Sequence, residues 1–172
     1  MGHYDRIVGG WMSESFGFAT GMPVVTYNKN GDTIQGKPEN LYEVIKDAVK
    51  NKYVINDAIN GCSDASKCES LIGGHAYTTL DAMYLESQKE YIIYVRNPWG
   101  VDTVTGRYSD SWLDKSENAA IKSEIEHTST KQDGCFWMSG DDYLKYFSSL
   151  TIGEQNDEMI NSYNLVKDAP AG

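Results

Sequence analysis

Two segments in the middle of the chain are rich in β-branched, aromatic and other apolar side chains. They span residues 76–85 and 91–95, and a polar stretch at residues 86–90 separates them. Apolar runs of this length around a short polar break are typical of two strands joined by a turn. The pattern therefore predicts a β-hairpin at the centre of the fold.

The open end of the predicted hairpin carries a histidine and an asparagine. If the turn centres near Ser87 or Gln88, antiparallel pairing places His75 nearly opposite residues 97–99, at roughly 5–8 Å for side chains on one face. His75 and Asn97 can then share a hydrogen bond. Thiol proteases use such a pair, because the imidazole takes the thiol proton and the asparagine fixes the ring. Without that context, a histidine at the start of a strand is more often structural.

Segments before the hairpin show strand and helix patterns. Residues 22–27 predict a strand, and apolar residues at helical spacing predict a helix over residues 40–49. Asn40 is the expected N-cap of this helix, with Glu43 completing a capping box. One face of the helix should pack on a sheet, and the polar residues 60–68 predict a loop.

The C-terminal part of the chain predicts shorter elements. Residues 111–127 permit a helix, residues 135–139 form an expected short strand, and residues 149–152 form a last strand. Ser139, together with Asp142, is the expected cap at the start of a helix between these two strands. Together these elements predict an antiparallel sheet packed against two or three helices, which is an α+β fold.

Composition narrows the class of protein. The 172 residues suffice for one domain with a real core, and the net charge of −10 disfavours a nucleic-acid partner. No run approaches the ~18–20 apolar residues that a membrane span needs, and no signal peptide is visible. The three cysteines, an odd number, do not predict a disulfide framework. They favour a reducing, intracellular compartment but do not identify one.

Four blocks of the chain keep a distinctive order and spacing. They are Gly74-His75-Ala76-Tyr77, Val95-Arg96-Asn97-Pro98-Trp99-Gly100, Thr105-Gly106-Arg107-Tyr108-Ser109-Asp110 and Asp133-Gly134-Cys135-Phe136-Trp137-Met138-Ser139. Together they resemble the calpain family of papain-like, calcium-dependent cysteine proteases. The resemblance implies the second subdomain of the protease core, with an antiparallel, partly barrel-like sheet flanked by helices. It also implies that His75 and Asn97 are catalytic and that Trp99 shields their hydrogen bond from water, which strengthens it.

The resemblance also suggests how the chain is divided. Residues 1–3 are interpreted as an added start, residues 4–153 as the histidine- and asparagine-bearing subdomain, and residues 154–172 as a tail or linker. The first half of a calpain core, which carries the nucleophilic cysteine at a helix N-terminus, is not found in the chain. An incomplete catalytic unit is therefore expected.

None of the three cysteines fits the role of nucleophile. Cys62 and Cys68 precede His75 by 13 and 7 residues and Cys135 follows it, whereas the papain-type nucleophile lies far upstream of its histidine. Cys62, Cys68 and His75 also offer zinc-ligand atoms, but their spacing matches no common zinc motif and no fourth ligand is evident. Small buried or loop residues are the expected role of all three cysteines.

Acidic residues in two loops raise the question of a calcium ion. The ligands that the resemblance implies are the side chains of Asp102, Asp110 and Asp133 and the carbonyl of Lys131. Thr103 and Cys135 stand where the family usually has glutamates. Because calcium takes six to eight oxygen ligands, the loss of two carboxylates predicts weak binding. A solvated acidic loop without calcium explains the same residues equally well.

The function implied is one half of a cysteine endopeptidase that acts on proteins or peptides. His75 would deprotonate a thiol on the missing half, from the same precursor or a separate chain, and Asn97 would orient the ring. No organic cofactor is implied. The alternative is a non-catalytic module, a protease-derived fold kept for binding or regulation. A cysteine roughly 130–160 residues upstream of His75, preceded by a glutamine, would favour the enzyme.

Overall fold

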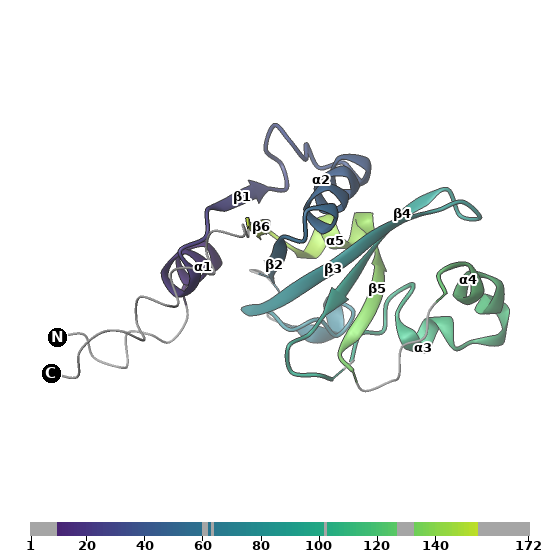
Figure 1. Ribbon diagram of the computed structural model, residues 1–172. Coiled ribbons are helices and arrows are strands. Elements are labelled where there is room, and N and C mark those ends of the chain that lie inside the picture. Colours follow the sequence, from purple (N-terminus) through teal and green to yellow (C-terminus); the bar gives the residue numbers. More distant parts are fainter. Residues whose placement is uncertain (1–9, 60–61, 63, 102, 127–132, 155–172) are drawn as a thin grey trace, which may run out of the picture.

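An antiparallel sheet of six strands organises the part of the chain that the computed structural model describes, residues 10–59, 62, 64–101, 103–126 and 133–154 (Figure 1). The strands are β1 (Val24–Asn28), β2 (Val54–Ile59), β3 (His75–Leu85), β4 (Glu90–Arg96), β5 (Cys135–Ser139) and β6 (Ser149–Gly153). Their order across the sheet is β1-β6-β2-β3-β4-β5. The sheet is not closed into a barrel, because β1 and β5 are its two edges.

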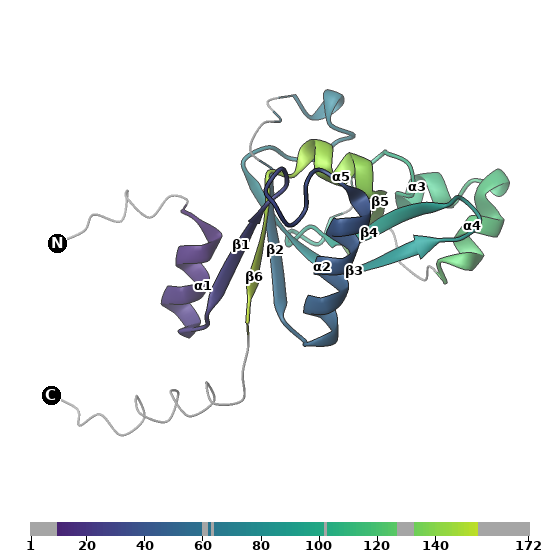
Figure 2. The same ribbon diagram turned by 90° about the horizontal axis from the view of Figure 1, so that it is seen from above.

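Helices flank this sheet, so the predicted α+β fold is confirmed. The described helices are α1 (Met12–Thr20), α2 (Pro38–Lys50), α3 (Asp110–Leu113), α4 (Ala119–Glu124) and α5 (Gly140–Tyr146), with 3-10 turns η2 (Ala65–Lys67) and η3 (Ser116–Asn118). Figure 2 shows α1 and α2 on opposite sides of the β1-β6-β2 part of the sheet. Within the residues described, no helix has the length and apolar character to cross a membrane.

The central hairpin forms as predicted. Strands β3 and β4 pair from Thr78 opposite Arg96 to Leu85 opposite Glu90, and residues 86–89 make the turn. A register shift interrupts the pairing between Thr79 and Asp81. Because of this shift, Thr78 lies opposite Arg96, and the register of the open end matches the expected one.

The main core lies between the sheet and helices α2 and α5, which contact each other and strand β4. Leu41, Ile45 and Ala48 are fully buried along one face of α2. Because side chains alternate along a strand, β4 contributes Ile93 and Val95 to this core. Burying each large aliphatic side chain contributes roughly 1.5–3 kcal/mol.

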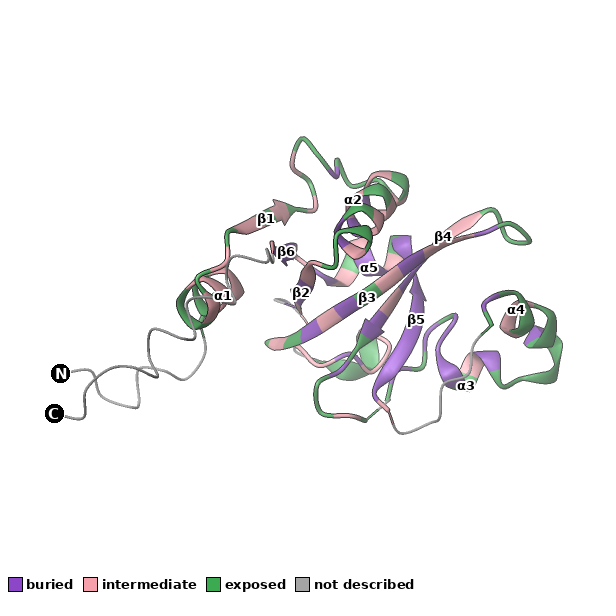
Figure 3. Cartoon of the chain, viewed as in Figure 1, coloured by how far each residue is buried: buried purple, intermediate pink, exposed green. Residues whose placement is uncertain are grey.

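A second apolar cluster covers the other face of β4 and β5. Its buried members are Leu85, Ile92, Tyr108, Leu113, Ile125 and Trp137. They come from the central hairpin, from β5 and from the segment that holds α3 and α4, which Figure 3 shows with several buried positions. The α3–α4 segment is thereby packed on the face of β4 opposite the main core. Strand β4 leads directly into the Asn-Pro-Trp-Gly motif at residues 97–100.

Two helix predictions need correction. The helix around residues 40–49 begins earlier, at Pro38, with Lys37 as N-cap, and the Asn40 side chain donates to the carbonyl of Ile34 at 3.2 Å. Proline is favoured at the first helical position because its missing N–H has no intrahelical partner there. The single helix permitted over residues 111–127 is two short helices, α3 and α4, separated by a 3-10 turn.

The cap predicted at the start of α5, Ser139 with Asp142, is confirmed. The backbone N–H of Asp142 donates to Oγ of Ser139 at 3.0 Å, and the Ser139 hydroxyl donates to the Asp142 carboxylate at 2.7 Å. The strands predicted near β1, β5 and β6 are also present. Helix α1 and strand β2 were not predicted.

The prediction that the cysteines form no disulfide framework was wrong for one pair, whereas Cys135 is the small buried residue that was expected. Cys62 and Cys68 form a disulfide, with their Cα atoms 6.2 Å apart, and Cys135 remains as a buried free cysteine. The short 3-10 turn η2 between the two cysteines folds the loop back on itself and brings them together. An odd number of cysteines therefore did not exclude a disulfide.

A carboxyl group is fully buried in the middle of the sheet. Asp57 on β2 accepts a hydrogen bond from the hydroxyl of Thr79 on β3, whose oxygen lies 3.3 Å from that of Tyr143 on α5. The other carboxylate oxygen, Oδ1, has no hydrogen-bond partner among the residues described. Burial raises the pKa of Asp57 to about 7, although the hydroxyls of Thr79 and Tyr143 oppose the shift.

This buried group makes the stability of the fold depend on pH. The pKa of Asp57 is about 7 in the folded chain, above its ordinary value of 3.8, so the folded state holds the proton more tightly than the unfolded state does. The stabilising contribution is therefore complete below pH ~4 and is lost as the pH rises to about 7, on the order of 1–4 kcal/mol in all.

Asp57→Asn should remove that part of the pH dependence, because the amide does not titrate. Urea unfolding at pH 5 and pH 8 measures the difference for wild type and variant. Asp47→Asn, at an exposed position on α2, is the matched control and should keep the wild-type difference. An unchanged difference in Asp57→Asn would show that this carboxyl group is not the source.

Candidate active site

His75 and Asn97 meet at the open end of the β3–β4 hairpin, as the register predicted. The Nε2 atom of His75 lies 2.9 Å from Oδ1 of Asn97. The backbone N–H of Trp99 donates to the same Oδ1 at 3.0 Å, and Nδ2 of Asn97 donates to the carbonyl of Val101 at 3.3 Å. These two contacts fix which end of the amide is the oxygen. Since that oxygen can only accept, Nε2 of His75 carries the proton, and Nδ1 is left as the proton acceptor of the ring.

The backbone of Asn97 is held as firmly as its side chain. Only 3% of the residue is exposed, and its N–H donates to the carbonyl of Gly134 at 2.8 Å. Gly134 has a φ of 77°, and a Cβ atom there would lie 2.6 Å from the carbonyl oxygen of Asn97. Glycine is therefore required at this close approach. The fourth sequence block thus packs directly on the asparagine of the second.

Aromatic rings surround the imidazole of His75. The Trp99 ring centroid lies 4.3 Å from that of His75, and the Tyr77 ring lies edge-on at 5.0 Å. His75 itself is half-buried, whereas 63% of Trp99 is exposed. Trp99 therefore contacts the imidazole, while much of the indole faces outward in this chain.

The cysteines of the chain do not supply a thiolate to His75. Cys62 and Cys68 are joined to each other, and Cys135 on β5 is only 8% exposed. Burial raises the pKa of the Cys135 thiol, and the nearby carboxylate of Asp133 adds to this. A nucleophilic cysteine needs the opposite shift, because the thiolate is the reactive form.

Two of the four expected calcium ligands lie in the described part of the chain. Asp110 is buried at the start of α3, and Oδ1 of Asp133 accepts from the backbone N–H of Cys135 at 2.8 Å. Both carboxylates lie close enough to the Tyr94 hydroxyl to raise its pKa, after the larger effects of burial and of Cys135. Asp102 and Lys131 fall outside the described residues. Among those that are described, no three His, Cys, Asp or Glu residues form a group that could hold a metal ion.

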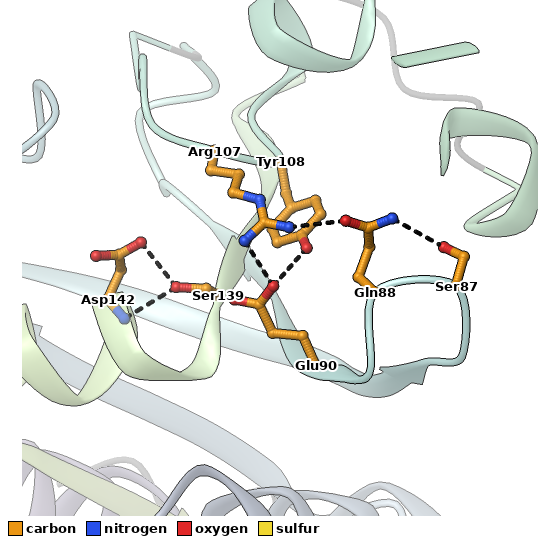
Figure 4. A network of polar contacts seen from close by, with 7 residues as sticks. All are labelled: Ser87, Gln88, Glu90, Arg107, Tyr108, Ser139 and Asp142. Carbon is orange, nitrogen blue, oxygen red and sulfur yellow. Dashed lines mark hydrogen bonds and ion pairs between the residues drawn. The ribbon is translucent and has the colours of Figure 1, made fainter. Parts of the chain in front are cut away.

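A polar network anchors the loop before Asp110 to the central hairpin (Figure 4). Arg107 forms an ion pair with Glu90 at 2.7 Å, and the hydroxyl of Tyr108 donates to the same carboxylate at 2.7 Å. Arg107 also donates to the side chain of Gln88 at 3.0 Å, next to the hairpin turn. The loop that begins after Asn97, at the end of strand β4, is thereby attached to the start of the same strand.

The model of the calpain family cysteine proteases matches residues 1–154. The chain belongs to the calpain family of cysteine proteases. The relationship inferred from the four sequence blocks is therefore confirmed.

Mammalian calpains are among the relatives. The chain is 30% identical to the calpain-2 catalytic subunit of Bos taurus over 174 residues, which cover 96% of this chain and 24% of that protein. It is 31% identical to the calpain-1 catalytic subunit of Rattus norvegicus over 176 residues, 95% of this chain and 23% of the relative. Calpain-8 of Rattus norvegicus is 30% identical over 181 residues, with 96% and 24% covered. The chain thus spans about a quarter of the length of these relatives.

Several residues that hold the pair in this calpain-family chain were not singled out from the sequence. These residues accept hydrogen bonds that only the fold reveals, through the carbonyl groups of Val101 and Gly134 and the hydroxyl of Tyr77. Gly134 had a local signal, since a glycine next to Asp133 predicts a turn with positive φ. The backbone carbonyl of Val101 had none, because every residue carries that group.

Proposed function

We propose that this chain is the histidine- and asparagine-bearing half of a calpain-like cysteine endopeptidase and is inactive without a cysteine-bearing half. The observation that carries the proposal is the 2.9 Å contact between Nε2 of His75 and Oδ1 of Asn97. The N–H of Trp99 and the carbonyl of Val101 fix the amide that makes this contact. A thiol protease needs its histidine in this orientation, with one ring nitrogen bonded and the other left for the thiol.

The reaction follows from the protonation state of the ring. Nδ1 of His75 accepts the proton of the incoming thiol, and Oδ1 of Asn97 continues to accept from Nε2 of the resulting imidazolium. The thiolate attacks the carbonyl carbon of the peptide bond, and the imidazolium returns its proton to the leaving amine. Water then releases the acyl group from the thiol. Proteins or peptides are the expected substrates of this protease-family chain.

The partner in this reaction is a cysteine-bearing half of a protease core, in the same precursor or on a separate chain. The disulfide and the buried Cys135 leave the thiol to be supplied from outside the chain. The exposed indole of Trp99 beside His75 offers a surface for that half to cover. The partner would also contribute most of the oxyanion hole.

Complementation tests this function. The chain is mixed with a cysteine-bearing half of a calpain core, or studied within the longer protein, and hydrolysis of a fluorogenic peptide is measured. The proposal expects no hydrolysis by either half alone and clear turnover by the two together. Stable association without turnover, in a buffer that keeps the thiol of the other half reduced and the Cys62–Cys68 disulfide intact, would instead favour a non-catalytic binding or regulatory module.

The oxygen donors of the two acidic loops are of the type that calcium binds. Asp110 and Asp133 provide hard carboxylate oxygens whose charges both raise the pKa of Tyr94, and the Asp102 side chain and Lys131 carbonyl would complete the protein ligands. Bound calcium would tie together the two loops that meet at the end of β4. Since Gly134 contacts Asn97 there, this link would steady the catalytic asparagine.

A titration of the chain with calcium should show weak binding, with a dissociation constant of roughly 10⁻⁴–10⁻³ M, because two family glutamates are replaced. Asp110→Asn and Asp133→Asn should each weaken it further, since each removes a negative charge from the site. Isothermal titration calorimetry measures the effect, with Asp47→Asn as a control at an exposed site outside the loops. No heat from wild type at millimolar calcium, or equal binding by every protein, would rule out the site.

A further inference from the structure

The disulfide between Cys62 and Cys68 closes the loop that leads into His75. Residues 64–67 inside this loop are exposed, while both cysteines are half-buried against the main core. One side of the loop therefore faces solvent, and the disulfide on its other side packs against the folded chain. The established family relationship assigns no role to this pair.

One side of the loop braces the strand that begins with His75. The carbonyl oxygen of Cys62 lies so close to Gly73 that a Cβ atom there would be 1.9 Å away. Ile72 directly precedes Gly73, and its backbone N–H donates to the hydroxyl of Tyr77 at 2.9 Å. The ring of Tyr77 in turn packs edge-on against the imidazole of His75. A displacement of the loop would therefore reach the imidazole through these direct contacts.

The other side of the loop braces the segment that follows Asn97. The carbonyl of Glu69 accepts from the backbone N–H of Thr105 at 3.1 Å, and the carbonyl of Ser70 accepts from the hydroxyl of Thr103 at 3.4 Å. Both acceptors lie directly after the second cysteine of the disulfide. The cross-linked loop thus joins the two segments that carry the histidine and the asparagine of the candidate active site.

We propose that Cys62 and Cys68 are a reversible redox modification site whose disulfide keeps His75 and Asn97 aligned. Without the cross-link the loop gains conformational freedom, and its carbonyl groups hold the two segments less firmly. The inference rests on the proposed function only for its effect on turnover. The redox reaction and its effect on the position of His75 do not depend on catalysis.

The reaction is thiol–disulfide exchange with a low-molecular-weight disulfide such as oxidised glutathione. The thiolate of one cysteine attacks a sulfur of oxidised glutathione, which forms a mixed disulfide and releases one glutathione thiolate. The second cysteine thiolate attacks the protein sulfur of that mixed disulfide, which closes the bond and releases the other glutathione. Two protein thiols are oxidised, one glutathione disulfide is reduced, and the two protons pass to the released thiolates. Excess reduced glutathione drives the same steps backwards.

The test uses the chain itself in glutathione buffers that range from reduced to oxidised. Mass spectrometry after alkylation counts the free thiols, and NMR records the imidazole of His75 and the indole N–H of Trp99 in the same samples. The proposal expects both signals to shift together with the Cys62–Cys68 thiol titration. Amide hydrogen exchange at Ile72 and Thr105 should be faster in the dithiol form by on the order of tenfold.

Matched variants distinguish a redox effect of Cys62 and Cys68 from an effect of Cys135. They also distinguish it from a disulfide that only stabilises the fold. The double variant Cys62→Ser, Cys68→Ser should show the spectrum of the reduced form in every buffer, whereas Cys135→Ser should respond like wild type. A disulfide that only stabilises the fold would lower the melting temperature on reduction and leave the His75 and Trp99 signals in place. That result, or thiols that never titrate, would overturn the proposal. Because the readout needs no activity, failure of complementation would count against the proposed function alone.

Discussion

Replacing His75 by alanine should abolish peptide hydrolysis when the chain is combined with a cysteine-bearing half. The Nδ1 atom of His75 is the proton acceptor proposed for the thiol, and the ring is fixed by a 2.9 Å hydrogen bond to Asn97. General acid–base catalysis by a positioned side chain contributes about 10²–10⁴-fold, and here the same ring also activates the nucleophile. A loss of at least ~10³-fold in kcat/KM is therefore expected.

The control for this measurement is Glu43→Gln, an exposed position on α2 that should leave turnover at the wild-type level. Circular dichroism checks that His75→Ala keeps the fold, since His75 is only half-buried. The isolated chain should show no hydrolysis with or without calcium. Robust activity of the isolated chain that disappears on Cys62→Ala or Cys135→Ala would instead place the nucleophile within this chain.

The pair could be found from the sequence because most of the information that sets it is local. The turn at residues 86–89 fixes the register of the hairpin as far as the pairing of Asp81 with Tyr94. The shift between Thr79 and Asp81 had no local signal, although it changes the register by one residue, sets Thr78 opposite Arg96 and brings His75 to Asn97 across 22 positions. Alternation of side chains then places both residues on one face.

Strand β2 was not predicted because its stabilising contacts are distant in the sequence. The polar residues Asn56 and Asp57 interrupt its apolar pattern, and both are unfavourable in strands by propensity. In the fold, β2 lies between β6 and β3, and Asp57 faces hydroxyl groups from Thr79 and Tyr143. Tertiary context therefore overrides the local preference of this segment.

Helix α1 and the disulfide were missed for different physical reasons. Helix α1 buries none of its residues fully, so it lacks the apolar stripe that reveals an amphipathic helix. The disulfide depends on the 3-10 turn η2, which reverses the loop over a few polar residues. Counting cysteines carries no information about such a reversal.

Asn97→Ala should lower kcat of the reconstituted enzyme by about 10²-fold with little change in KM, because a misplaced catalytic ring costs that much in orientation. The substitution also leaves the N–H of Trp99 and the carbonyl of Val101 unpaired, which costs roughly 1–3 kcal/mol of stability. The rates are therefore measured at a temperature where urea or thermal unfolding shows the variant to be fully folded.

Asn97→Asp separates orientation from packing at the same position. A carboxylate still accepts from Nε2 of His75 and from the N–H of Trp99, but its second oxygen has no proton to donate and faces the carbonyl oxygen of Val101. Turnover should therefore stay within about 10-fold of wild type, well above that of Asn97→Ala. The carboxylate also favours the imidazolium, so the alkaline limb of the kcat profile should move to higher pH. Equal rates for Asn97→Ala and wild type would show that Asn97 does not orient the ring.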